Sequence, residues 1–121
     1  YELRACAAPV DAGSSWSDVE AADCTPLVDE SVSVVVLEGT SRHEPSSVSG
    51  ARYAFGDFPV NTPAHSVEIT GTQPMGTVLI AEPANERIRR EMTGNADRTS
   101  WTGFVGSRGP TEYWLLMSPA G

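Results

Sequence analysis

Apolar and polar residues alternate with a period of two in seven short stretches of the chain, a pattern typical of half-buried β-strands. The clearest stretch is Ser31–Glu38, where Val32, Val34 and Val36 share one face while further valine and leucine residues occupy the other. Because this stretch is apolar on both faces, we expect a central strand that is covered on both sides over part of its length. The other six predicted strands are Tyr1–Ala7, Ala51–Phe55, His65–Thr70, Gly76–Glu82, Ser100–Val105 and Glu112–Ser118.

Residues 8–30 form a long, largely irregular connection between the first two strands. Within it, Ser15–Ala22 has a helix-start pattern: Ser17 is the expected N-cap, Asp18 lies in the first turn, and Glu20 follows three residues after the cap. We therefore predict one short helical turn inside this connection.

The segment Ala84–Met92 contains strong helix formers, and Ile88 and Met92 are spaced as neighbours on one helix face. Gly94-Asn95 supplies a stop signal. We predict a short surface helix here, with a polar strand as the alternative. On such a helix the charged side chains would form surface ion pairs among Glu86, Arg87, Arg89, Arg90 and Glu91.

Seven strands separated by turns predict an all-β fold: an antiparallel Greek-key β-sandwich of about seven strands, with one short surface helix. A chain of 121 residues can form one core but not two independent ones, so we expect residues 1–121 to be a single β-sandwich domain. The inward strand faces predict a core of Val34, Val36, Tyr53, Phe55, Val67, Ile69, Val78, Ile80, Leu115 and Met117.

The chain is acidic, because sixteen acidic residues against eight basic ones give a formal net charge of −8. This balance disfavours nucleic acid and anionic lipid as partners. All eight basic residues are arginine, so no lysine amine is present for a Schiff base or an isopeptide bond. The longest apolar run, Val34–Leu37, is too short for a membrane span, and no signal peptide precedes Tyr1. We therefore expect an excised or mature soluble piece.

The two cysteines, Cys6 and Cys24, flank the irregular connection. No C-x-x-C motif occurs, and the histidines His43 and His65 are distant in sequence, which argues against a zinc site. A disulfide that ties the connection to the first strand fits better, and closing a loop of this length contributes about 3 kcal/mol in the chain-entropy model. This disulfide predicts a secreted or cell-surface location, whereas two free thiols in a cytosolic protein are the alternative.

A glycine-led strand with alternating aromatic residues, Gly50–Pro59, is followed by His65–Ile69 and preceded by the valine strand Val32–Glu38. This arrangement resembles the prealbumin-like repeats of bacterial surface proteins, the collagen-adhesin B-type and SpaA-type domains. The placement of the two cysteines and the closing Tyr113-Trp114 strand resemble a variant found in secreted proteins of thermophilic Chloroflexi. The resemblance covers residues 1–82 and 112–119. It implies that the predicted sandwich is prealbumin-like, with an immunoglobulin-like sandwich as the alternative. It also implies a spacer, stalk or ligand-presenting module in a larger extracytoplasmic protein.

Two features depart from the family pattern. The loop after Pro59 is longer and lacks the family's glycine, since it reads Val60-Asn61-Thr62-Pro63. The family's isopeptide bond needs a lysine, and this chain has none. If the resemblance holds, the disulfide is therefore the one covalent cross-link available to the domain.

No set of residues has catalytic spacing, so we expect the chain not to be an enzyme and to need no cofactor. The nearest approach to a G-x-S-x-G nucleophile motif, Gly103–Ser107, has the wrong order. His43 and His65 would have to meet a carboxylate in space to bind a metal ion, and we expect no metal site.

The candidate ligand-binding residues are the three tryptophans, Trp16, Trp101 and Trp114, because carbohydrate-binding β-sandwiches stack sugar rings on exposed aromatic side chains. Trp101 and Trp114 lie on predicted strands, where a core position is the competing interpretation. Trp16 lies in the cysteine-flanked connection and is expected to be the most exposed of the three.

These observations predict a non-catalytic structural or adhesive module of a secreted or cell-surface bacterial protein. Its expected partners are neighbouring domains of the same polypeptide and a surface glycan or protein ligand, with no nucleic acid and no membrane span. The alternative is a carbohydrate- or other ligand-binding accessory domain attached to an extracellular enzyme. An exposed, coplanar pair of tryptophans would favour this alternative.

Overall fold

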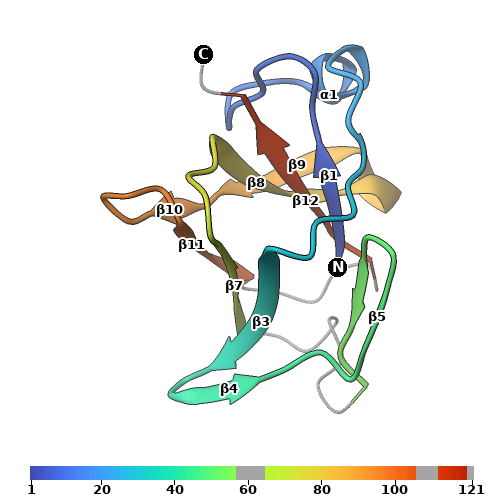
Figure 1. The fold of residues 1–121 in the computed structure, drawn as a ribbon. Coiled ribbons are helices and arrows are strands. Elements are labelled where there is room, and N and C mark those ends of the chain that lie inside the picture. Colours follow the sequence, from blue (N-terminus) through green and yellow to red (C-terminus); the bar gives the residue numbers. More distant parts are fainter. Residues whose placement is uncertain (57–64, 106–111, 120–121) are drawn as a thin grey trace.

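Two β-sheets lie face to face in the computed structural model, which describes residues 1–56, 65–105 and 112–119 (Figure 1). Sheet A has the strand order β5 (Ser47–Ser49), β6 (Arg52–Ala54), β1 (Glu2–Ala5), β12 (Trp114–Ser118), β8 (Thr77–Glu82) and β9 (Arg87–Glu91), and the short β2 (Thr25–Pro26) also pairs with β1. Sheet B has the order β10 (Thr93–Gly94), β11 (Ser100–Val105), β7 (His65–Gly71), β3 (Val32–Glu38) and β4 (Ser41–His43). The all-β fold class and the sandwich-like arrangement are confirmed.

The first and last strands of the chain, β1 and β12, run parallel, with Leu3 paired to Leu115. Every other strand pairing within the described residues is antiparallel. The expectation of a purely antiparallel sandwich is therefore wrong at this pair, and sheet A is mixed. The alternation of apolar and polar residues indicates on which face of the sheet a side chain lies, but it does not indicate whether neighbouring strands run parallel or antiparallel.

The structure has a strand at each of the seven predicted positions, with ends that differ by at most two residues. The described residues also contain five further short strands, β2, β4, β5, β9 and β10, so the strands number twelve rather than about seven. Four of these five lie at the edges of the two sheets, where short and polar segments produce little hydrophobic alternation. The turn into β4 uses Gly39, whose φ of 60° is favourable for glycine.

The space between the sheets is filled by apolar side chains from both of them. Nine of the ten predicted core residues are buried, and the tenth, Met117, is half-buried against them. Trp101 also belongs to this main core, where its ring lies against Gly94 of the neighbouring strand. A Cβ atom at Gly94 would lie 2.9 Å from three atoms of that ring, so the close approach requires glycine. The predicted strand phase is confirmed.

A second, smaller core covers the outer face of sheet A. The sheet contributes Leu79, Ala81 and Leu116 from β8 and β12, and the connection after β1 contributes Val10 and Val19. Sheet A is therefore covered on both faces, since the main core occupies its inner side. The connection is thus a packed layer of the fold.

The predicted helical turn is present as α1 (Trp16–Ala21), which carries Val19 into the second core. Its N-cap is Ser15 rather than the predicted Ser17. Ser15 Oγ accepts a hydrogen bond from Asp18 N, and the Asp18 carboxylate accepts one from Ser15 N, which together form a capping box. The helix therefore begins two residues earlier than predicted, with Asp18 in place of Glu20 as the acidic residue of the box.

The segment predicted as a surface helix is a strand. After one 3-10 turn (Pro83–Asn85), Glu86 takes a left-handed backbone conformation with φ 50°, and β9 then pairs antiparallel with β8. Ile88 packs against the second core and Met92 lies in the main core. The helix prediction is wrong and its alternative, a polar strand, is confirmed, because pairing with β8 lets this segment cover both cores.

Candidate functional site

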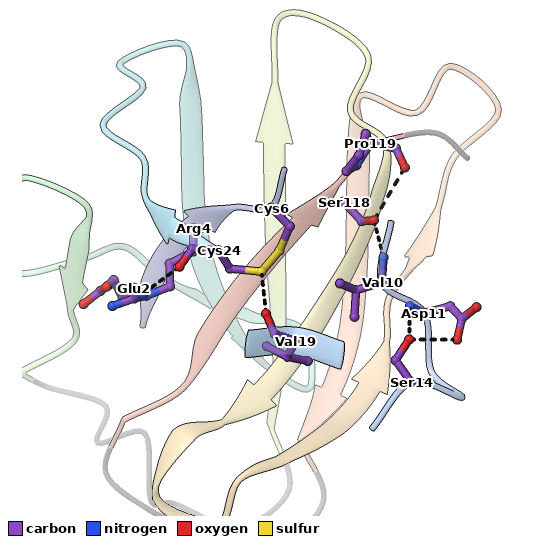
Figure 2. Close-up of a disulfide and its surroundings, with 10 residues drawn as sticks. All are labelled: Glu2, Arg4, Cys6, Val10, Asp11, Ser14, Val19, Cys24, Ser118 and Pro119. Carbon is purple, nitrogen blue, oxygen red and sulfur yellow. Dashed lines mark hydrogen bonds and ion pairs between the residues drawn. A yellow bond between two sulfur atoms is a disulfide. The ribbon is translucent and has the colours of Figure 1, made fainter. Parts of the chain in front are cut away.

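The cysteine-flanked connection is fastened over the outer face of sheet A. Cys6, which follows β1, and Cys24, which follows α1, form the predicted disulfide, and Figure 2 shows this bond above the helix. Backbone hydrogen bonds lie beside it: Cys6 N donates to Met117 O over 2.9 Å, and Ala7 N donates to Ala22 O over 2.8 Å. The disulfide prediction is confirmed.

Polar contacts tie the same connection to the strands beneath it. Val10 N donates to the buried Ser118 Oγ of β12 over 2.7 Å (Figure 2). A guanidinium nitrogen of Arg4, on β1, donates to Cys24 O over 2.8 Å. One covalent bond and several hydrogen bonds therefore fix the position of this layer against sheet A.

Two of the three candidate tryptophans meet beside this layer. The rings of Trp16 on α1 and Trp114 on β12 stack, with centroids 5.7 Å apart and planes inclined by 27°. The guanidinium carbon of Arg4 lies 3.9 Å from the Trp114 ring centroid, which is a cation–π contact. Trp16 is half-buried by this packing, so the expectation that it is the most exposed tryptophan is confirmed only relative to the buried Trp101.

A pocket of about 440 Å³ surrounds the stacked pair, and we call it the aromatic pocket. It combines the two indole rings with one guanidinium and three carboxylates, and its lining is Arg4, Trp16, Val19, Glu20, Asp23, Cys24, Pro83, Glu86 and Trp114. Arg4 is already engaged, since its Nε donates to Glu2 Oε1 over 2.7 Å. Because this guanidinium is bonded to Glu2, the pocket carboxylates of Glu20, Asp23 and Glu86 are left as hydrogen-bond acceptors for a ligand with hydroxyl or ammonium groups.

Trp101 takes no part in the aromatic pocket. It is 8% exposed in the main core, and its Nε1 donates to Arg98 O over 3.0 Å. The core interpretation of Trp101 is therefore correct, and its ring offers no surface to a ligand.

The two histidines lie on strands that are separated by β3 in sheet B. His65 is 1% exposed, and its Nε2 lies 2.6 Å from the phenolic oxygen of Tyr1, with which it shares a hydrogen bond. Burial raises the pKa of the Tyr1 phenol far above its ordinary value, so Tyr1 is a neutral group in this pair. Within the described ranges, no three histidine, cysteine, aspartate or glutamate side chains are grouped to hold a metal ion.

Sequence reasoning missed two buried, ion-paired glutamates, Glu2 and Glu82. Glu82 is fully buried, and its Oε1 lies 2.6 Å from a guanidinium nitrogen of Arg89. Its Oε2 accepts hydrogen bonds from Arg87 Nε over 3.0 Å and Asn85 Nδ2 over 2.8 Å. The expected helix-surface pairs of these arginines are thus replaced by pairs to a buried carboxylate of β8. The available signal was the position of Glu82 on the inward phase of an otherwise apolar strand.

Comparison with protein-family models, with curated proteins and with solved structures found no significant match to this chain. In the part of the chain that the structure describes, no helix has the length and apolar character needed to cross a bilayer. The function is therefore inferred from the disulfide-fastened layer, the aromatic pocket and the remaining surface of the sandwich.

Proposed function

We propose that this domain is a non-catalytic structural and adhesive module of a secreted or cell-surface protein. The observation that carries the proposal is the Cys6–Cys24 disulfide, which fastens a separate apolar layer onto sheet A. Disulfides of this structural kind persist in oxidising compartments and are rare in the cytosol. Sheet A is thereby protected on both faces, which suits a module that holds neighbouring domains of its polypeptide apart outside the cell.

The proposal extends to a Greek-key, prealbumin-like fold of the kind found in bacterial surface proteins. The two-sheet arrangement and the valine-rich β3 support it, and the resemblance to collagen-adhesin B-type and SpaA-type repeats supplies the class. The residues 57–59 that complete the resembling stretch, and the predicted turn after Val105, lie outside the described residues. Because the chain has no lysine, the disulfide takes the place of the family's isopeptide cross-link in this proposal.

A second candidate function is carbohydrate binding by an accessory domain of an extracellular enzyme, and the aromatic pocket favours it. Trp16 provides an aromatic surface beside Glu20, Asp23 and Glu86, whose carboxylates would accept hydrogen bonds from sugar hydroxyls. The two rings do not form a joint platform for a sugar, because Trp114 is packed against both the Trp16 ring and the Arg4 guanidinium. This candidate therefore depends on one aromatic ring.

The proposed location outside the cell is tested on cells that produce this protein. Protease digestion of intact cells, followed by immunoblotting, should degrade the domain or release it while a cytosolic marker stays intact. Complete protection on intact cells, with cleavage only after lysis, would contradict the proposal. A hydrolase panel provides a second test, because turnover that disappears in a folded His43→Ala or His65→Ala variant would show catalysis.

The carbohydrate alternative is tested by titrating neutral and acidic oligosaccharides into the domain while recording tryptophan fluorescence. Trp16→Ala should abolish binding if the aromatic pocket is the site. Phe104→Ala is the matched control, because Phe104 is 48% exposed and lies outside that pocket. Equal binding by both variants would exclude the aromatic pocket.

A further inference from the structure

The aromatic pocket carries more negative charge than the residues around it neutralise. Its three carboxylates come from Glu20 on α1, from Asp23 after that helix, and from Glu86 just before β9. None of the three forms an ion pair with another described residue. Arg4 is the one basic residue in the described lining, and it is neutralised by Glu2, since Arg4 Nε lies 2.7 Å from Glu2 Oε1. An ammonium group in the pocket would therefore meet three carboxylates that no other described charge compensates.

A cation already lies against one aromatic ring of this pocket. The guanidinium carbon of Arg4 is 3.9 Å from the ring centroid of Trp114, and an indole face is the best aromatic partner for a cation. Arg4 thus occupies Trp114, which also stacks on Trp16. Trp16 is half-buried and lines the pocket, so it stays accessible to a ligand there.

Two of the carboxylates are held at the pocket by an uncommon backbone conformation. Asp23 has a φ of 54° and Glu86 a φ of 50°, both in the left-handed region. They are two of the three described non-glycine residues with a positive φ, and the third, Arg98, lies outside the pocket lining. Residues held in this region gather at binding sites. Since glycine adopts this conformation without a steric cost, Asp23→Gly and Glu86→Gly can remove a carboxylate while keeping the local backbone.

The size of the aromatic pocket suits a small organic ligand rather than an extended chain. Its volume of about 440 Å³ lies within the range of roughly 300–1,000 Å³ that is typical of small-molecule sites. Its lining combines an aromatic side chain, on which a sugar ring can stack, with carboxylates that accept hydrogen bonds from hydroxyl and ammonium groups. A neutral sugar would use the hydroxyl contacts alone, and an acidic sugar would be repelled. An amino sugar uses the ring, the acceptors and the charge together.

We propose that the aromatic pocket binds an amino sugar, with the sugar ring on Trp16 and its ammonium group among the carboxylates of Glu20, Asp23 and Glu86. The inference rests on the carbohydrate-binding alternative of the proposed function and names its ligand class. The ammonium group gives the pocket its selectivity, because acetylation of the amine removes the charge and leaves the sugar ring in place. The net charge of −8 also attracts a cationic saccharide at low salt.

The test is a calorimetric titration of the intact, disulfide-bonded chain with three trisaccharides of the same linkage, in mildly acidic buffer where a glucosamine amine is protonated. The glucosamine trimer carries ammonium groups, the N-acetylglucosamine trimer carries neutral amides, and the glucose trimer carries hydroxyls at the same positions. We expect saturable binding of the glucosamine trimer, at least about tenfold tighter than that of either neutral trimer, because hydrogen bonds between charged groups are the stronger ones. Added salt should narrow this preference, since it screens the attraction.

The indole N–H signals of the three tryptophans locate the bound sugar by NMR. Binding should shift the signals of Trp16 and Trp114, which line the pocket. The signal of Trp101 should stay in place, because its Nε1 donates to Arg98 O and its ring lies in the main core. A shift of the Trp101 signal alone would place the ligand elsewhere and overturn the assignment.

Matched variants separate the charge of the pocket from the charge of the whole chain. Asp23→Gly and Glu86→Gly should each weaken binding of the glucosamine trimer roughly threefold to tenfold, while the midpoint of urea unfolding stays nearly unchanged. Glu44→Gln removes one charge from an exposed side chain outside the pocket and should leave binding unchanged. Trp16→Ala should abolish binding, whereas Phe104→Ala, at an exposed aromatic side chain outside the pocket, should not alter it.

Equal affinity for the glucosamine and N-acetylglucosamine trimers would overturn the ammonium assignment and leave the carbohydrate alternative in place. Equal losses in Glu44→Gln and Glu86→Gly would show a response to the charge of the whole chain and overturn the site. Binding of N-acetyl-lysine methylamide as tightly as the glucosamine trimer would show a general amine site and overturn the amino-sugar class. Failure of all three trimers to bind would overturn the carbohydrate alternative as well, whereas the exported structural module is judged separately by protease digestion of intact cells.

Discussion

The buried carboxylate of Glu82 provides a quantitative test of how β9 is held against β8. Glu82 is fully buried and contacts two arginines that differ sharply in exposure. The side chain of Arg89 is 13% exposed, whereas that of Arg87 is 57% exposed. The perturbations are therefore Glu82→Leu, Arg89→Met, Arg87→Met and the double variant Glu82→Leu/Arg89→Met.

The expected magnitudes follow from burial. Removing one partner of a buried ion pair leaves an uncompensated charge and costs about 3–5 kcal/mol, so Arg89→Met and Glu82→Leu should each lose on the order of 3 kcal/mol of unfolding free energy. The pair between Glu82 and the exposed Arg87 is screened by solvent, and Arg87→Met should lose less than about 1 kcal/mol. Replacing Glu82 and Arg89 together removes both buried charges, so the double variant should be more stable than either single variant.

The assay is urea unfolding monitored by tryptophan fluorescence and far-ultraviolet circular dichroism. The unmodified chain, Glu82→Leu, Arg89→Met and the double variant form a double-mutant cycle, and Arg87→Met is the solvent-exposed comparison. A coupling free energy between Glu82 and Arg89 of at least about 2 kcal/mol is expected. Equal losses for Arg87→Met and Arg89→Met, or additive losses in the double variant, would refute the reasoning from burial.

Three further predictions concern the main core. Ile69→Ala removes a fully buried side chain and should lower the unfolding free energy by about 2–4 kcal/mol in urea titrations. Thr70→Ala, on the exposed face of the same strand, should lower it by less than about 0.5 kcal/mol. Equal losses would show that the strand phase is wrong by one residue. Gly94→Ala should destabilise by roughly 1–3 kcal/mol and shift the fluorescence of Trp101, because the added Cβ overlaps that ring; unchanged stability would contradict the close approach. Because burial raises the folded-state pKa of the Tyr1 phenol, its contribution to stability should be present below pH about 10 and lost above it, where the unfolded phenol ionises. Tyr1→Phe should flatten this alkaline decline in pH-dependent unfolding, and an identical decline in the variant would exclude Tyr1 as its source.

The strands and the main core could be predicted because a two-residue period determines which side chains face inward. Residues 84–92 misled this reasoning, since the four-residue spacing of Ile88 and Met92 fits one face of a helix. In the structure a register shift in the β8–β9 pair, between Ile80 and Ala81, separates the two, and they contribute to different cores. The decisive local feature, the left-handed conformation of Glu86, has no signal in its residue type. The direction of β1 relative to β12 depends on pairing between the two ends of the chain, which alternation does not encode.

The candidate sites were harder to predict because they depend on contacts between distant segments. Trp16 and Trp114 stack only after the connection folds over sheet A, so sequence could name both rings but not bring them together. The second core did leave a signal, because β8 is apolar on both faces through Leu79 and Ala81. β4 pairs with only the last three residues of β3, and the local sequence signal for this early end is Pro45, which has no N–H with which to continue the ladder.

The central claim is that the domain is exported and cross-linked by a disulfide between Cys6 and Cys24. Its most direct test is the thiol state of these cysteines in the cells that produce the protein. Those cells would be lysed in acid, and the protein alkylated under denaturing conditions without reductant and weighed as an intact molecule. We expect no alkyl adducts and a mass lower by two hydrogens than that of the reduced chain. Two adducts per chain would show free thiols in the cell and contradict both the disulfide and the extracytoplasmic location.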